Sequence, residues 1–445
     1  MQAADFDADI GIHVFTTKTP GLGGRIRCQL EDFVVQEIDP DGAIAPLEPA
    51  QATYPDQVGK FVAFFLVKRN IDTLQAIRQL SRILGVSYKR FSYAGMKDRR
   101  AVTSQRISLH NASPQDLLGR DTPSLKMLHP HRVSKPIVPG SLQGNRFTIT
   151  IRDMEVTGTQ AAERIGRIKE EFEHQGGMLN FFGHQRFGTT QPNTHLIGKQ
   201  ILEGNLEEAV RVLLDKTALG APQMEEDGTE DVPEEAVAEP PQYLHPQQSY
   251  ERAISQYLAK HPADYGGSLR VLPKDLLRLY IHAYQAYLFN EMLSKRVKRR
   301  ISLTQPTVGD FVMPVTGETH AVRMVTTATL ARAEEAVRQG RQKLVIPLIG
   351  FDFAHIDFQG PMGEIVTSVL EKTQVAPAQF RIPQLPILSS RGTFRPVLVN
   401  PEGFQSSVVE DEPPIYVRLT FNLPKSSYAS VVLREFIKPR FINQL

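Results

Sequence analysis

The amino-acid sequence is poor in cysteine and contains no long apolar run. Cys28 is the single cysteine among 445 residues, which excludes an internal disulfide and any metal site built from several cysteines. We expect Cys28 to be buried as a small apolar side chain. No segment approaches the roughly 18 consecutive apolar residues of a membrane span, and the N-terminal residues are acidic, whereas a secretory signal is basic and then apolar. The sequence therefore predicts a cytoplasmic protein without a membrane partner.

Acidic residues are unevenly distributed along the chain. The formal net charge is +2, but residues 225–239 carry eight acids and no base. The rest of the chain therefore has 51 Lys and Arg against 41 Asp and Glu, a net charge of +10. Such a body favours a polyanionic partner, although charge alone does not choose among RNA, DNA and a solubilising surface. The acidic stretch is too polar to pack, and we expect a flexible insertion that tolerates deletion.

Strand patterns stand near both ends of the chain, and helical patterns fill the middle. Residues 61–67 form an apolar run of strand length, while residues 145–152 and 416–423 alternate between apolar and polar side chains, as half-buried strands do. Residues 274–300 and 428–437 have helical periodicity, and the first of these segments predicts a long amphipathic helix. At this length two or three domains are expected, and the order of elements predicts one sheet domain that carries an insertion.

A shorter helix is predicted over residues 70–85. Asp72 or Thr73 is expected to cap its N-terminus, and Gly85 to end it. The side chains expected on its buried face are Leu74, Ile77, Leu80 and Leu84.

Asp98 lies in the segment YAGMKDRR, between two short strand-like pieces and therefore on a loop. Its neighbours Lys97, Arg99 and Arg100 are cations, which favour the ionised carboxylate. An ionised, oriented carboxylate is suited to nucleophilic attack on an electrophilic carbon. From these residues alone, a surface loop whose charges simply pair is the alternative.

The segment YAGMKDRRAVTSQ resembles the signature of the TruD-type tRNA pseudouridine synthases. Further blocks resemble that family in the same order, and they are RIRCQLEDFVVQEI, FFLVKRNIDT, LQGNRFTITIR, NFFGHQRFG and NLPKSSYASVVLREF. The resemblance implies an α+β fold with a mostly antiparallel, pseudouridine synthase-like catalytic domain, formed by residues 1–179 and 401–445. It also implies an inserted α+β TRUD domain over residues 180–400, with a flexible acidic loop at 222–247, and RNA in a basic cleft between the domains.

The resemblance also assigns site residues. Asp98 falls on the family's catalytic aspartate, and Arg27 falls where the family places a basic residue near it. Four other residues fall on positions that contact the target nucleotide or line its pocket: Phe33, Asn145, Phe147 and Tyr428. For Phe147, ordinary core packing is the alternative. Tyr428 replaces a phenylalanine that is frequent in the family, and its aromatic ring can still stack there. Ser426 replaces a glycine, so the family's loop geometry is not carried over to this chain.

The chemistry implied by the resemblance needs neither a redox cofactor nor a metal, and we expect neither. The implied substrate is RNA, most specifically tRNA with uridine 13 as the family's target, and its base must be flipped into a pocket. We expect His184 and Arg186 to shape the pocket or to bind phosphate. The spacings of His129 with His131, and of Asp352 with His355 and Asp357, we attribute to chance rather than to metal binding.

Two functions of other classes remain open from the residues. One is a non-catalytic RNA-binding protein on the same scaffold, in which Asp98 is replaceable without consequence. The other is a metal-dependent RNA phosphodiesterase, which requires several carboxylates around Asp98, and the neighbouring sequence lacks them.

Overall fold

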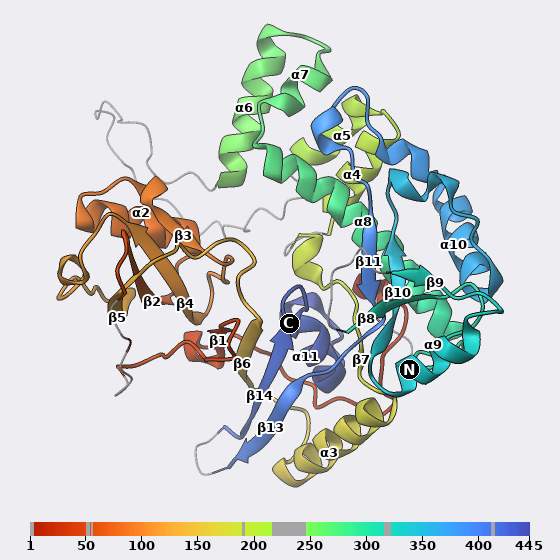
Figure 1. Cartoon of the computed structure of the whole chain (residues 1–445), viewed down its shortest axis with the longest axis horizontal. Helices are drawn as coiled ribbons and strands as arrows, with labels where there is room; N and C mark the ends of the chain where they lie inside the picture. The colour runs from red at the N-terminus through yellow and green to blue at the C-terminus, as the bar shows by residue number, and fades with distance from the viewer. Residues whose placement is uncertain are drawn as a thin grey trace, which may run out of the picture. The chain divides into compact units, whose positions relative to one another are not determined.

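The computed structural model describes most of the chain as two compact units, shown in Figure 1. The first unit comprises residues 15–180 and 398–445, and the second comprises residues 2–14 and 181–397. The predicted acidic loop, residues 222–247, lies outside the described residues except for its last two positions. The described residues are 4–49, 54, 57–188, 192–215, 246–315, 322–410 and 414–445.

The first unit is built on an eight-stranded sheet in the order β13-β14-β6-β1-β4-β2-β5, with β3 paired to β4. Only the β1–β4 pair of this sheet is parallel within the described residues. Because β13 and β14 come from the C-terminal end, the sheet joins both ends of the chain (Figure 1). The mostly antiparallel α+β prediction is confirmed. The strands are β1 Phe33–Ile38, β2 Phe61–Arg69, β3 Phe91–Tyr93, β4 Val102–His110, β5 Leu125–Val133, β6 Gly144–Ile151, β13 Glu402–Val409 and β14 Tyr416–Pro424, with a separate pair of β7 Met178–Leu179 and β12 Leu398–Val399.

Helices pack on this sheet and cover the apolar side chains of its strands. Side chains of β6 and β14 form one core cluster with α3 (Gly158–His174) and α11 (Ala429–Ile437). A second cluster joins α2 (Thr73–Leu84) to β2 and β4. The predicted alternation over residues 145–152 and 416–423 is confirmed, since Ile149, Ile151 and Leu419 are fully buried.

Helix α2 begins and ends as predicted, but one residue of its predicted buried face is wrong. The Asp72 carboxylate accepts the Gln75 N–H at 2.9 Å, and Gly85 ends the helix with φ +64°. Leu74, however, is 48% exposed. The Thr73 hydroxyl bonds Gln105 of the sheet, so the buried face is rotated towards Thr73. The fully buried positions are Thr73, Ala76, Ile77 and Leu80.

The prediction for Cys28 is also wrong, because this side chain is exposed. Its segment does not continue as a strand: Arg25 makes a single bridge to Arg152, and Arg27 then turns the chain with φ +60°. The turn directs Cys28 away from the core that Ile26 enters.

The second unit surrounds the long helix α8 (Lys274–Lys298). The predicted helix at 274–300 is confirmed, but its amphipathic character is wrong, because α8 is buried on nearly all sides from Leu277 to Arg296. Among the described residues, no helix is both long and apolar enough to cross a membrane. The other helices are α1 Asp5–Ala8, α4 Thr194–Leu202, α5 Leu206–Leu214, α6 Pro246–Lys260, α7 Tyr265–Arg270, α9 Leu330–Arg338 and α10 Gly360–Thr373, and the sheet β11-β10-β8-β9 consists of β8 Phe311–Pro314, β9 Arg323–Met324, β10 Gln342–Leu348 and β11 Thr393–Pro396.

A buried ion pair holds the end of α8 in the second unit. The side chains of Arg296 and Asp310 are each 1% exposed, and Arg296 Nη2 lies 3.0 Å from Asp310 Oδ2. Asp310 also accepts the Thr307 N–H at 2.8 Å, and Arg296 Nε donates to the Ser302 carbonyl at 3.0 Å. Arg296 is therefore a structural cation that joins the helix to the segment before β8.

Replacing Asp310 with alanine should lower the free energy of unfolding by about 3–5 kcal/mol, because Arg296 is then left as a buried, unpaired charge. Urea denaturation of both variants measures the difference. The control is Asp275→Ala on the same helix, where an exposed pair with Arg278 at 3.6 Å is lost. This control should change the free energy by less than about 0.5 kcal/mol. Equal effects of the two substitutions would contradict the assignment.

Candidate active site

The loop between β3 and β4 carries Asp98, as predicted, and buried side chains hold its backbone. Lys68 Nζ donates to the Asp98 carbonyl at 2.6 Å and to the Ile71 carbonyl at 2.8 Å. Gln105 Nε2 donates to the Gly95 carbonyl at 2.8 Å. The Asp98 side chain itself is 43% exposed. The loop therefore presents a carboxylate to solvent from a backbone that is fixed beneath it.

Lys68 is fully buried although it lies at the end of an apolar strand. Burial lowers the pKa of Lys68 to about 8, and the negative charge of Asp98 acts in the opposite direction. Below this pH the ammonium is charged, and its donors are directed at backbone carbonyls. The Lys68 ammonium therefore holds the backbone of the Asp98 loop in position.

A second buried lysine holds the same loop from the other side. Lys97 Nζ lies 2.7 Å from Glu37 Oε2, and both side chains are almost fully buried. The Lys97 N–H donates to the Thr73 hydroxyl at 3.0 Å, and Glu37 also accepts the Arg106 N–H at 3.2 Å. Lys97 was expected to sit beside the Asp98 carboxylate, but its charge is directed into the sheet.

Arg27 supplies the cation that faces Asp98. Its Nη2 lies 3.9 Å from Asp98 Oδ1, and its guanidinium carbon lies 4.1 Å from the centre of the Phe33 ring. Arg100 Nη2 donates to the Arg27 carbonyl at 2.8 Å. Burial lowers the pKa of Arg27, Asp98 opposes this effect, and Arg100 adds to it. Arg27 Nε has no hydrogen-bond partner among the described residues.

Asn145 lies on β6 and is connected to the Asp98 loop through its strand neighbour Glu37. It pairs with Glu37 of β1 on one side and with Leu423 of β14 on the other. Glu37 in turn holds Lys97, the residue before Asp98. The Asn145 Oδ1 atom is buried and finds no hydrogen-bond partner in the described part of the chain. An unsatisfied buried acceptor at this position is suited to a donor from a ligand.

The two phenylalanines of the predicted pocket are core residues in this structure. Phe33 and Phe147 are 3% and 7% exposed, and their ring centres lie 6.3 Å apart in an edge-to-face arrangement. Phe147 also stacks on Phe421 at 5.7 Å. The exposed side of Phe33 is covered by the Arg27 guanidinium. Phe33 therefore supports Arg27, while Phe147 packs beneath it.

The turn before Tyr428 contains a backbone conformation that favours glycine, although the residue there is a serine. Ser426 has φ +68°, in the left-handed region. The turn is tied to the start of β6, because the Lys425 N–H donates to the Gln143 carbonyl at 3.1 Å. Tyr428 is half-buried at the N-terminus of α11. The left-handed backbone conformation of Ser426 is therefore a source of local strain.

Ser426→Gly should raise the free energy of unfolding by about 0.5–1 kcal/mol, because glycine enters the left-handed region without a Cβ clash. Ser426→Val should lower it by about 1 kcal/mol, since a β-branched side chain is poorly tolerated there. Urea denaturation of the three proteins provides the comparison. The same sign of change for both substitutions would contradict the strained turn.

The weaker sequence candidates belong to the second unit, whereas Asp98 belongs to the first. His184 belongs to the second unit, where it is 6% exposed and its Nε2 lies 2.9 Å from Asp7 Oδ1. Arg186 lies in the same unit, 5.7 Å above the Phe182 ring. Across the described ranges, no group of three or more His, Cys, Asp or Glu side chains is arranged to hold a metal ion.

Sequence reasoning missed two of the charges that hold the site. Glu37 and Lys68 each stand near the end of a mostly apolar strand. A charge at an inward-facing strand position is rarely tolerated without a partner. A charged residue in an apolar strand pattern was therefore the sequence signal that could have predicted a buried polar network.

Comparison with known proteins identifies the family of the chain. The sequence model of the family described as tRNA pseudouridine synthase D (TruD) matches residues 9–436. A relative from Methanococcoides burtonii, named "Probable tRNA pseudouridine synthase D", is 35% identical over 97% of both chains. One from Thermococcus sibiricus with the same name is 32% identical, over 95% of this chain and 97% of its own. A TruD crystal structure from Methanosarcina mazei matches with a TM-score of 0.79 and 32% identity, over 100% of both chains. The chain belongs to the tRNA pseudouridine synthase D (TruD) family.

Proposed function

We propose that this protein isomerises a uridine of tRNA to pseudouridine, with Asp98 as the nucleophile. The observation that carries the proposal is the Asp98 carboxylate itself, half-exposed on a fixed loop and 3.9 Å from Arg27. The loop sequence matches the family signature, and the relatives are named for this activity. Uridine 13 is the proposed target, as expected from the family resemblance.

The reaction requires a nucleophile and controlled proton transfer, and electrons are neither gained nor lost. The bond between N1 and C1′ breaks, a bond between C5 and C1′ forms, the proton on C5 leaves, and N1 takes up a proton. Asp98 would form a bond to an electrophilic carbon of the nucleotide, and this bond would break again before pseudouridine is released, which regenerates the carboxylate. Arg27 would keep the carboxylate ionised and oriented. The fixed backbone of the loop keeps the carboxylate in one position during the reaction.

Other residues of the first unit offer what a flipped uracil needs. The buried, unpartnered Asn145 Oδ1 is suited to accept the uracil N3–H. The half-buried Tyr428 offers an aromatic ring for stacking. Phe33 would act through Arg27, whose guanidinium it supports, and Phe147 would shape the floor of the pocket. In this proposal the two phenylalanines line the site from below.

RNA binding is proposed to use the basic body of the chain and the second unit. Outside residues 225–239 the net charge is +10, which favours contacts with phosphates. We propose that the catalytic domain, predicted as residues 1–179 and 401–445, and the inserted TRUD domain, predicted as 180–400, divide the work between chemistry and substrate selection.

A non-catalytic RNA-binding protein on the same scaffold is the alternative function. It would bind RNA through the same basic surface but would not depend on the Asp98 carboxylate. The two functions therefore differ in what a nearly isosteric change at Asp98 does to the RNA product.

Asp98→Asn should abolish isomerisation while leaving RNA affinity largely intact, because the amide preserves shape but is not a nucleophile. Pseudouridine formed in a tRNA substrate, and RNA affinity, are the two measurements. Asp352→Asn is a matched control, since Asp352 is also about half-exposed and pairs with an arginine, Arg391, at 3.4 Å. Turnover by Asp98→Asn above trace level would show that Asp98 is not the nucleophile.

Arg27→Ala should lower the single-turnover rate by roughly 100-fold, with a much smaller loss of RNA affinity, if Arg27 orients Asp98. Arg27→Lys should restore part of the rate, because it keeps the charge but not the guanidinium plane. Asn145→Ala should instead weaken substrate affinity as well as rate, since it removes a contact to the base. A loss of affinity with no loss of rate in Arg27→Ala would place Arg27 on the RNA-binding surface.

A further inference from the structure

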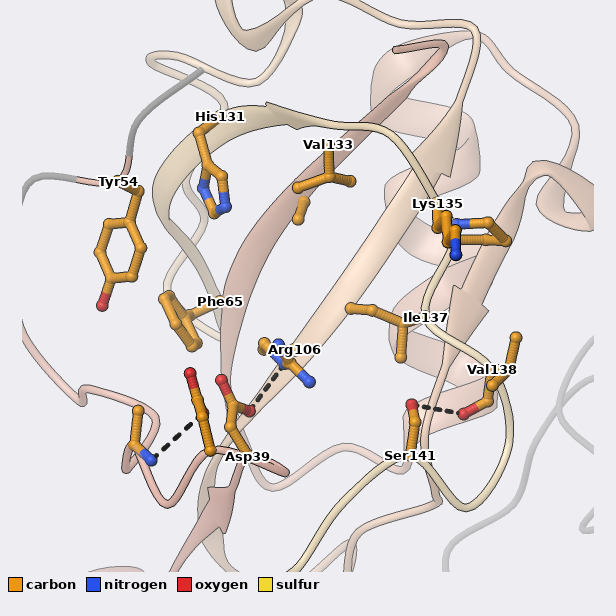
Figure 2. Close-up of a pocket in the computed structure, with 14 residues that line it drawn as sticks. Asp39, Tyr54, Phe65, Arg106, His131, Val133, Lys135, Ile137, Val138 and Ser141 are labelled. Carbon is orange, nitrogen blue, oxygen red and sulfur yellow. Dashed lines mark hydrogen bonds and ion pairs between the residues drawn. The ribbon is translucent and has the colours of Figure 1, made fainter. Parts of the chain in front are cut away.

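A hollow of the first unit lies on the opposite face of the sheet from the elements that hold Asp98. Side chains alternate between the faces of β2 and β4. Lys68 and Gln105 lie on the α2 face, whereas Phe65 and Arg106 lie on the other and line the hollow. Its volume is about 340 Å³ (Figure 2). This hollow is distinct from the site described above.

One wall of the hollow is aromatic. Tyr54 stacks on His131 with ring centres 5.0 Å apart and an interplanar angle of 19°, and it lies 5.3 Å from the Phe65 ring. Figure 2 shows these three rings together along one side. Aromatic walls of this kind stack nucleobases, and each stacked base contributes about 1–3 kcal/mol.

The adjoining wall carries a buried acid and a base that are incompletely bonded. Asp39 is 4% exposed, and Arg106 Nε lies 2.7 Å from its Oδ1. The contact is an ion pair without hydrogen-bond geometry, because neither atom has a hydrogen-bond partner among the described residues. Buried polar atoms are almost always hydrogen-bonded. These two atoms are buried against each other, so a ligand in the hollow would meet the other carboxylate oxygen of Asp39 and the other nitrogens of Arg106, whose side chain is 25% exposed.

Guanine matches this pair of groups better than the other bases do. Its edge places the O6 acceptor beside two donors, N1–H and N2–H, so a guanidinium can donate to O6 while a carboxylate accepts from both nitrogens. Adenine, cytosine and uracil each offer only one donor position to the carboxylate. The exposed Lys135 on the rim is available for a phosphate.

We propose that this hollow binds one unpaired guanine nucleotide of RNA. The proposal rests on the proposed function, because RNA is the expected ligand of the chain. The base would stack on the Tyr54 and His131 wall, and its edge would meet Asp39 and Arg106.

The rim of the hollow also touches the active-site loop. The Ile137 N–H donates to the Ser108 hydroxyl at 2.9 Å, which fixes the rim segment to β4. Farther along, the Gly140 N–H donates to the carbonyl of Ala94, at the start of the Asp98 loop, at 2.8 Å. A nucleotide in the hollow would thus be held at a defined position relative to the loop.

Protonation of Asp39 gives the site a pH dependence. Burial raises the pKa of Asp39 to about 7, Arg106 opposes this effect, and Glu37 and Asp41 add to it. Guanine needs the ionised carboxylate, so affinity should rise between pH 6 and pH 8. Other ionisable groups that line the hollow are Tyr54, His131 and Lys135.

The test is calorimetric titration of the full chain with 5′-GMP, 5′-AMP, 5′-CMP and 5′-UMP. We expect 5′-GMP to bind roughly ten-fold tighter than the others, and Asp39→Asn to remove most of that preference. Asp32→Asn is the matched control, since Asp32 is also buried and pairs with an arginine, Arg152, at 2.8 Å, but does not line the hollow. It should keep the preference. His131→Ala, on the half-buried wall, should weaken binding of all four nucleotides and serves where Asp39→Asn does not fold.

Asp98→Asn separates the two proposals. It should retain 5′-GMP binding while it loses isomerisation. Absence of 5′-GMP binding, equal affinity for the four nucleotides, or an Asp39→Asn variant that folds and keeps the preference would overturn the guanine site and leave the proposed function untouched. Guanine-selective binding by a chain that forms no pseudouridine would overturn the proposed function and leave the guanine site standing.

Discussion

Burial of two lysines, Lys68 and Lys97, in the first unit is the constraint on which the position of the Asp98 loop depends. An ammonium removed from water costs several kcal/mol unless it is paired and hydrogen-bonded. Lys97 meets this requirement through Glu37, and Lys68 meets it through the carbonyls of Asp98 and Ile71. Lys68 and Glu37 belong to strands, so these contacts hold the backbone of the loop against the sheet. The loop backbone in turn sets the point from which the Asp98 carboxylate extends.

The same constraint explains the division of labour among the charges near Asp98. The cations that hold the loop are buried and directed at the backbone or at Glu37, so they do not face the carboxylate. Among the described residues, Arg27 forms the ion pair with the Asp98 carboxylate, from a left-handed turn and above the Phe33 ring. A guanidinium is suited to this position because it stacks on an aromatic face and remains charged when partly buried. Positioning and electrostatics are therefore carried by different side chains.

The buried side of a helix or strand could be predicted where apolar residues recur with the period of one face. It could not be predicted where the element is buried on nearly all sides. The alternating strands that became β6 and β14 and the capped helix α2 follow from local spacing. Helix α8 does not, because neighbours on every side bury even its polar residues, among them Gln285, Asn290 and Arg296. Cys28 is exposed because a turn at Arg27 interrupts the expected strand. Both differences arise from neighbours distant in sequence.

By itself, the sequence determined the family, the loop that carries Asp98 and the residue types available for chemistry. These follow from the order of short motifs and from turn chemistry, which are local properties. Only the tertiary structure decided which cation faces Asp98, which acceptor is left unsatisfied at Asn145, and that Phe33 and Phe147 are covered. Such contacts join residues that are tens of positions apart. Local periodicity specifies which face of an element is buried, but it does not specify which side chain lies opposite.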